Sequence, residues 1–134
     1  MKPRIRLLSA RDHAVDTGAA ILALPNDADP LAHALAIAHA VRVELHFPAF
    51  TDGRAFSQAY LVRRRLGFKG DLRATGDVLA DQLLQMERTG FSSAVLAEGV
   101  DRDEAQRQLE RFASFYQADA LNTAPWQKAR HNED

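Results

Sequence analysis

Short polar and charged residues stand just after two apolar segments of the chain. Asp52, Gly53 and Arg54 follow the first segment, and Gly76 and Asp77 follow the second. Carboxylates can do acid–base work when they are buried or paired, and glycines at helix starts let backbone N–H groups approach an anion. The structural alternatives are helix N-caps for the carboxylates and tight turns for the glycines. The sequence leaves both interpretations open.

Other side chains are expected near the same place. If the apolar segments are parallel strands, their carboxyl ends meet at one edge, together with Asn26, Asp27, His46 and Glu98. Two helix N-termini, together with the guanidinium groups of Arg54 and Arg73, would suit a small oxyanion. No catalytic residue can be assigned from the sequence. The predicted ligand-binding residues are Phe50, Thr51, Asp52, Gly53, Arg54, Arg73, Gly76, Asp77 and Gln82.

Composition excludes several classes of protein. The chain has no cysteine, which excludes disulfides, Cys-ligated clusters and thiol catalysis. Its five histidines form no HxxxH or HxH pair, so we expect no metal site. With 17 basic and 18 acidic residues, it is not a general nucleic-acid or membrane-surface binder. No apolar run approaches a membrane span, and the N-terminal apolar core is too short for a signal peptide, so we expect a cytoplasmic protein.

Apolar runs and turn residues predict strands alternating with helices. A helix with Asp29 as its N-cap and Pro30 at its first position should follow the first strand. Two later helices should each end at a Gly-Phe pair, Gly67-Phe68 and Gly90-Phe91. Asp101 should cap the last helix. The predicted strands are 19–24, 41–47, 71–75 and 93–97.

A weak repeat at an offset of 23 residues relates 53–75 to 76–98. Strands and helices joined by such short links require right-handed parallel crossovers. We therefore predict one α/β domain over 1–134, with about four consecutive βα units and a parallel sheet resembling half of a (β/α)8 barrel. The alternative is an open, doubly wound sheet. Exposed edges and apolar inner residues of a half barrel predict a homodimer.

The two ends of the chain carry little pattern. Residues 1–18 are predicted to be an irregular segment, and 118–134 a polar tail.

Arg63, Arg64 and Arg65 form a charge run on a helix whose other side is apolar. A solvated face is the simpler interpretation of this run, and a docking patch for an acidic partner is the alternative.

Three sequence motifs indicate a family resemblance: F-P-x-F-x-D-G-R, L-R-x-x-x-G-[FY]-x-G-[ED]-[LI]-R-A-x-G-D-V and D-Q. The chain thereby resembles a proteobacterial family, domain of unknown function 934, over residues 47–91. The matched positions are Phe47, Pro48, Phe50, Asp52, Gly53, Arg54, Arg63, Gly67, Phe68, Gly70, Asp71, Leu72, Arg73, Ala74, Gly76, Asp77, Val78, Asp81 and Gln82.

The resemblance implies a pathway rather than a reaction. Members lie beside the assimilatory sulfite reductase gene and are labelled as oxidoreductases of sulfite reduction. The expectation is an accessory protein that binds the reductase subunit or a small oxyanion at the carboxyl ends of the strands. It would hold no cofactor, and any redox centre would belong to the partner. A small stand-alone oxidoreductase with an Asp/Arg site and a regulatory binding module remain alternatives, so enzymatic activity stays open.

Overall fold

Five parallel strands form one sheet in the spatial order β1-β5-β4-β3-β2. The computed structural model describes residues 4–18 and 20–121, with side chains as far as residue 114. Strands β2 to β5 are neighbours in chain order, whereas β1 joins beyond β5. The strands are β1 (Arg6–Leu8), β2 (Ile21–Leu24), β3 (Arg42–Phe47), β4 (Asp71–Gly76) and β5 (Ser93–Val95).

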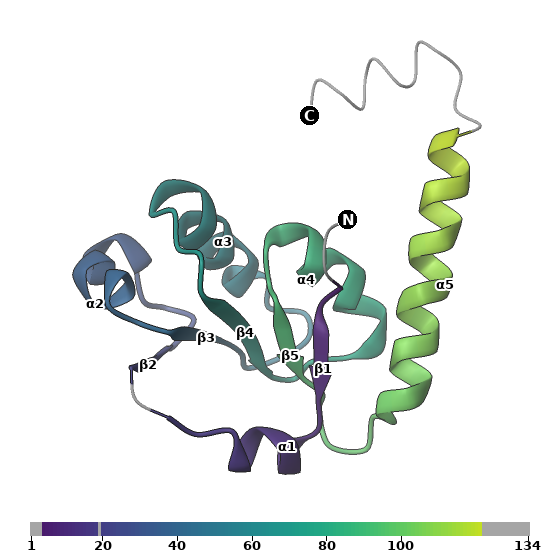
Figure 1. Cartoon of the computed structure of the whole chain (residues 1–134), viewed down its shortest axis with the longest axis horizontal. Helices are drawn as coiled ribbons and strands as arrows, with labels where there is room; N and C mark the ends of the chain where they lie inside the picture. The colour runs from purple at the N-terminus through teal and green to yellow at the C-terminus, as the bar shows by residue number, and fades with distance from the viewer. Residues whose placement is uncertain (1–3, 19, 122–134) are drawn as a thin grey trace.

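The helices divide between the two faces of the sheet. Figure 1 shows α2, α3 and α4 over one face, α1 at the other, and α5 rising beside β1. Right-handed crossovers between sequential parallel strands place their helices on a single face in this way. The helices are α1 (Ala10–Val15), η1 (Pro30–His33), α2 (Ala34–Ala38), α3 (Arg54–Tyr60), η2 (Leu61–Arg65), η3 (Ala80–Gln82), α4 (Leu83–Thr89) and α5 (Arg102–Leu121).

The predicted α/β class with a parallel sheet is confirmed. Strands 41–47 and 71–75 pair in parallel, with Val43 opposite Leu72. The order of β2 to β5 is the sequential order of a half barrel, and the sheet is open, with β1 and β2 at its edges. Both Gly-Phe helix exits are present, with Phe68 and Phe91 buried after them.

Three predictions about the chain's organisation were wrong. The N-terminal segment 1–18 is not irregular, because it contains β1 and α1. Helix α5 continues to Leu121, into the segment predicted as a polar tail, while residues 122–134 lie outside the described part. Val41 was predicted to be the first residue of a strand, but it precedes β3 and is 67% exposed.

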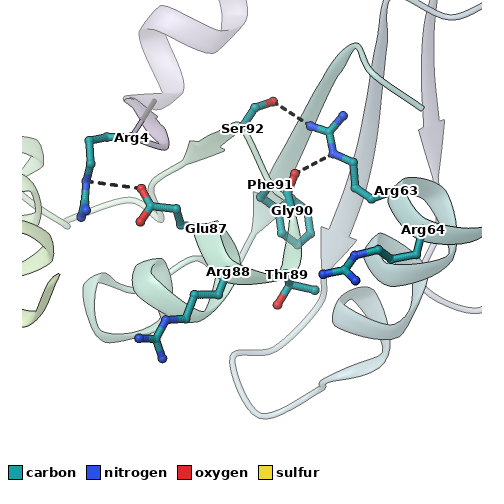
Figure 2. A pocket seen from close by; sticks show the side chains of 9 residues that line it. All are labelled: Arg4, Arg63, Arg64, Glu87, Arg88, Thr89, Gly90, Phe91 and Ser92. Carbon is teal, nitrogen blue, oxygen red and sulfur yellow. Dashed lines mark hydrogen bonds and ion pairs between the residues drawn. The ribbon is translucent and has the colours of Figure 1, made fainter. Parts of the chain in front are cut away.

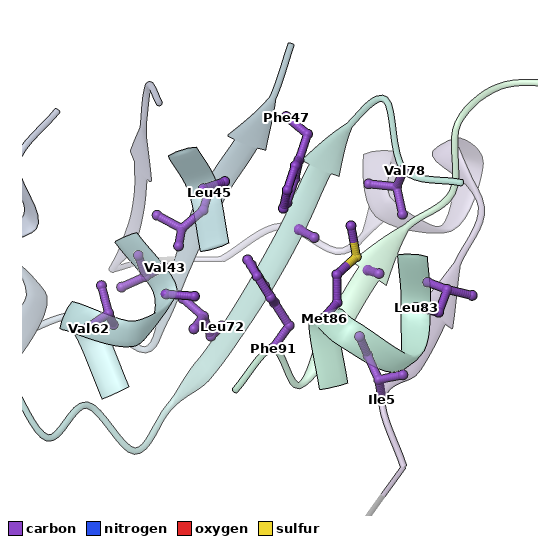
Figure 3. Packing of buried hydrophobic residues seen from close by; sticks show 14 of the residues in the cluster. Ile5, Val43, Leu45, Phe47, Val62, Leu72, Val78, Leu83, Met86 and Phe91 are labelled. Atoms are coloured by element: carbon purple, nitrogen blue, oxygen red, sulfur yellow. The ribbon is translucent and has the colours of Figure 1, made fainter. Parts of the chain in front are cut away.

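The core lies between the sheet and the helices α2 to α5. Alternate strand residues Val43, Leu45 and Phe47 point to this side and are fully buried, as a period of two requires. Met86 of α4 and Phe91 pack against them (Figure 3). The rings of Phe47 and Phe91 lie 5.8 Å apart. This packing fixes the positions of the loops that leave the carboxyl ends of β3 and β4.

Candidate functional site

The β3–α3 loop (residues 48–53) is held by its own carboxylate. Asp52 accepts hydrogen bonds from the Arg54 backbone N–H (3.1 Å) and from Arg54 Nη2 (2.9 Å). Asn26 Nδ2, from the loop after β2, donates to the same carboxylate at 2.7 Å. The Arg54 side chain first and its backbone N–H second lower the pKa of Asp52. Asp52 therefore ties two loops together as an anion.

A second carboxylate joins this loop to the β4–α4 connection. Asp77 Oδ2 accepts the Phe50 backbone N–H at 2.8 Å, and Gln82 Nε2 donates to the Phe50 carbonyl at 2.6 Å. Both backbone groups of Phe50 are therefore bonded, yet the residue as a whole is 51% exposed. The loop presents its aromatic ring to solvent on a fixed backbone.

Gly76 allows the two connections to approach each other. It has φ +95°, and a Cβ at this position would collide with the Phe47 carbonyl oxygen and with the His46 ring. The Asp77 N–H donates to the Phe47 carbonyl at 2.8 Å. Gly76 is therefore needed for close packing of backbone on backbone.

Most of the predicted site residues do come together at this edge. Phe50, Asp52, Arg54, Asp77 and Gln82 are linked through the hydrogen bonds above, with Thr51, Gly53 and Gly76 between them in the chain. The two aspartates connect loops, but neither is the helix N-cap that was the structural alternative, because the N-cap of α3 is Gly53 and that of η3 is Leu79. Their carboxylates accept the Phe50 and Arg54 N–H groups, which an external anion at this edge would also need.

The prediction for Arg73 was wrong. This side chain is 0% exposed and points to the sheet face opposite the core. Arg73 donates from Nε to Ser93 Oγ (2.9 Å) and from Nη2 to Asp16 (2.7 Å) and Asp71 (3.0 Å). Its Nη1 lies 3.1 Å from His13 Nδ1. Arg73 thus stabilises the fold beneath α1 and lies apart from the linked loop residues at the carboxyl edge of the sheet.

Arg73 belongs to a charged network that we call the polar face. Arg42 donates to Glu44 Oε2 at 2.9 Å and lies 3.3 Å from Asp16. Arg6 lies 3.6 Å from Asp71. Three guanidinium groups thus face three carboxylates, and the network is electrically balanced without a ligand. Its charged members are Arg6, Asp16, Arg42, Glu44, Asp71 and Arg73.

The pKa values of Asp16 and Asp71 are both lowered by contacts within the polar face. The Arg73 hydrogen bond is the main cause that lowers the pKa of Asp16. Burial by itself would raise the pKa of Asp71, but hydrogen bonds from Ser92 and Ser93 and the charge of Arg73 outweigh burial and lower it. Both carboxylates are therefore held in the charged form.

Sequence reasoning missed this network although the signal was present. In β3 the apolar residues Val43 and Leu45 alternate with Arg42 and Glu44, so strand periodicity assigns the charges to one face. The residues that cover this face, His13 and Asp16, lie in the segment predicted to be irregular. The remaining candidates at the carboxyl edge, Asp27, His46 and Glu98, are exposed.

In the described part of the chain, no group of three His, Asp or Glu side chains is arranged to hold a metal ion. None of its helices combines the length and the apolar composition that crossing a bilayer requires.

The fold and site define a parallel α/β protein with a rigid loop surface at the carboxyl edge of its sheet. Residues 21–127 match the family described as bacterial protein of unknown function (DUF934), and the chain belongs to this family. The match extends beyond the segment 47–91 on both sides. No curated protein and no solved structure matches the chain.

Proposed function

We propose that this protein is an accessory factor of assimilatory sulfite reduction that docks onto the reductase subunit through Phe50 and Arg54. The observation that carries the proposal is the fixed backbone of Phe50, a residue that is 51% exposed, in the same loop region as the exposed Arg54. Aromatic and arginine side chains dominate the energetics of protein interfaces. A preorganised loop loses little conformational entropy when it binds. The pathway itself comes from the family resemblance.

A protein partner fits this edge better than the small oxyanion that was the other expectation. The Phe50 N–H is bonded to Asp77, and the Arg54 N–H to Asp52. An anion would have to displace a carboxylate from each donor. The positive charge of Arg54 is also neutralised by Asp52, with which it forms two side-chain hydrogen bonds.

The proposal assigns the electron-transfer chemistry to the partner. The chain has no cysteine, and its own contribution is a binding surface. We further propose a cytoplasmic homodimer, in which the open edge strand β2 is covered by a second copy.

The test is binding of the purified reductase subunit, measured by calorimetry, to the wild type and to Phe50→Ala and Arg54→Ala. Each variant should weaken binding about tenfold or more, as hot-spot residues do. Leu35→Ala is the matched control for Phe50, because Leu35 is an apolar residue of α2 that is 76% exposed. Arg107→Ala is the matched control for Arg54, because Arg107 is equally exposed and is paired with Glu104 at 2.7 Å.

Folded Phe50 and Arg54 variants that bind like the controls would overturn the docking surface. A wild-type protein that does not bind the reductase subunit at all would overturn the accessory role itself.

A further inference from the structure

Arg63 lies in the wall of a pocket at the amino end of the sheet, where it stabilises the fold (Figure 2). Its Nε donates to the Gly90 carbonyl at 2.8 Å. Its Nη1 donates to the carbonyls of Phe68 (2.9 Å) and Gly70 (2.8 Å). The interpretation of the arginine run as a solvated face was wrong for Arg63, which is partly buried. This pocket is thus part of the fold, whereas the edge strand β2 has an open side.

The two edges of the sheet differ in what protects them. At the β1 edge, α5 stands beside the strand (Figure 1), and Arg4 Nη2 donates to the Leu109 carbonyl of α5 at 3.4 Å. The first residue of β1 is also charged. β2 is the last strand at the other edge, and all four of its residues, Ile21–Leu24, are uncharged. An edge strand without charge, proline or cover pairs readily with another strand.

The hydrogen bonds of β3 show which backbone groups of β2 face outward. The Phe47 carbonyl accepts an N–H of the β4–α4 connection at 2.8 Å, so the odd-numbered residues of β3 bond to β4 and the even-numbered ones to β2. Accordingly, the Arg42 N–H points to the Ala20 carbonyl at 3.4 Å. Because Arg42 is in register with Ile21, the even-numbered residues of β2 bond to β3. Ile21 and Ala23 therefore turn their N–H and C=O groups away from the sheet.

A second copy of the chain can satisfy all of these outward groups at once. In an antiparallel pair, residues at every second position exchange two N–H···O bonds with the residue opposite. If a twofold axis passes beside Leu22, Ile21 of one copy lies opposite Ala23 of the other. All outward N–H and C=O groups of both β2 strands are then bonded. An axis at Ala23 would instead place Ile21 opposite Pro25, which has no N–H.

The side chains of β2 also suit contact with their own copy. A twofold axis brings each residue near it against the same residue, so a charge there would repel itself. β2 is free of charge, whereas the neighbouring strand β3 carries Arg42 and Glu44. Leu22 lies on the core side of the sheet, in register with Val43, and is only partly buried. Pairing of Leu22 with its own copy would bury the rest of its surface, so the edge fits a second copy of this chain.

We propose that two copies join edge to edge through antiparallel pairing of β2 with β2, centred on Leu22, into one continuous sheet. This inference rests on the homodimer proposed above and specifies its interface. Because the two β2 strands run in opposite directions, the carboxyl edges of the two sheets face opposite ways. The two docking surfaces formed by Phe50 and Arg54 then stand at opposite ends of the dimer, and one dimer binds two partner subunits.

The first experiment is oxidative cross-linking of Leu22→Cys in the full chain, which has no cysteine of its own. In this register the two Cα atoms at position 22 lie about 4.5 Å apart, within the range of a disulfide. The variant should shift to a disulfide-linked dimer on a non-reducing gel. Ala23→Cys is the matched control, because Ala23 is the next residue of the strand and is exposed. Its two copies lie diagonally, about 7–8 Å apart, so little dimer should form.

Ala23→Pro supplies a second variant that does not depend on cross-linking. It removes the outward N–H of Ala23 and leaves the hydrogen bonds between β2 and β3 intact, so the monomer should still fold. Light scattering should give the mass of a monomer for Ala23→Pro. Ala23→Ser is the matched control, because it keeps the N–H, and it should give the mass of a dimer.

The outcomes separate the register from the rest of the proposed function. A folded Ala23→Pro variant that stays dimeric, or a dimeric Leu22→Cys variant that cross-links no better than Ala23→Cys, would overturn the β2 register. If Leu22→Cys does not fold, the comparison of Ala23→Pro with Ala23→Ser decides. A monomeric wild type would overturn the homodimer together with its interface. Failure of the reductase subunit to bind would overturn the accessory role and leave the β2 interface standing.

Discussion

Replacing Arg73 with alanine removes the centre of the polar face. The guanidinium group is fully buried, and it contacts Ser93 at 2.9 Å, Asp16 at 2.7 Å, Asp71 at 3.0 Å and His13 at 3.1 Å. All four contacts are lost in Arg73→Ala, and two carboxylates lose their closest cation. The variant should therefore be strongly destabilised, in contrast to a surface arginine whose removal changes only binding.

The size of this effect follows from the surroundings. Removing one partner of a buried ion pair destabilises a protein by about 3–5 kcal/mol. The Asp16 side chain is 43% exposed and can be rehydrated, and Asp71 keeps its hydrogen bonds from Ser92 and Ser93. We therefore expect Arg73→Ala to lower the free energy of unfolding by about 3 kcal/mol at pH 7, the low end of this range. For a chain of this length that corresponds to a fall in Tm of roughly 10 °C.

The pH dependence gives an independent readout. Arg73 lowers the pKa of Asp16 and contributes to the lowering of that of Asp71. A carboxyl group with a lowered folded-state pKa stabilises the fold above its unfolded pKa, and this stability is lost as the pH falls through the folded value. The difference between wild type and Arg73→Ala should be complete at pH 7 and should shrink below about pH 4.

The assay is urea unfolding followed by circular dichroism, at several pH values from about 7 to about 3.5. Arg54→Ala is the control, because Arg54 is exposed and its loss should change the free energy of unfolding far less than the loss of Arg73 does. An Arg73→Ala variant as stable as Arg54→Ala would refute the structural role of the network. A stability difference that stays constant over this pH range would refute its electrostatic basis.

Three further outcomes are expected. Gly76→Ala should lower the free energy of unfolding by at least ~2 kcal/mol in urea titrations, because of its positive φ and the collision of the new Cβ with Phe47; an unchanged midpoint would contradict the close packing of the two connections. Asp101→Ala should lower the free energy of unfolding by about 1 kcal/mol, because Asp101 Oδ1 accepts the Asp103 N–H at 2.9 Å at the start of α5. Asp103→Ala is the control, because it removes no side chain that caps the helix. Light scattering should give the mass of a dimer at about tens of micromolar, and a monomer would show that β2 remains an open edge.

Local patterns were sufficient to predict most of the core. The apolar alternation of β3 and the Gly-Phe exits are set by neighbouring residues, so the sequence specified them correctly. Strand β1 is only three residues long and begins with the charged Arg6, and its pairing with β5 depends on distant residues. No local pattern reveals such a strand.

The sequence likewise placed some of the site residues correctly and others wrongly. Asp52 and Asp77 follow strand ends, and the parallel sheet brings them to one edge as predicted. Arg73 was misplaced because its position in the chain suggested that edge, whereas the alternation of Leu72, Arg73 and Ala74 sends its side chain to the opposite face. The partly buried Arg63 was also hidden, since its acceptors are backbone carbonyls, including that of Gly90, 27 positions away.

The pairing of β1 with β5 has a consequence for synthesis of the chain. Leu8 pairs with Val95, a separation of 87 positions, so the first strand to leave the ribosome completes the sheet last. At about 5–20 residues per second, the N-terminal segment waits roughly 4–17 s for its partner. During this interval β5 is still being synthesised, so only β2 to β4 can associate, with the Arg73 guanidinium group of β4 still hydrated. We therefore expect the polar face to be dehydrated only when β5 and the N-terminal segment join the sheet, because Ser93, His13 and Asp16 supply the contacts of Arg73.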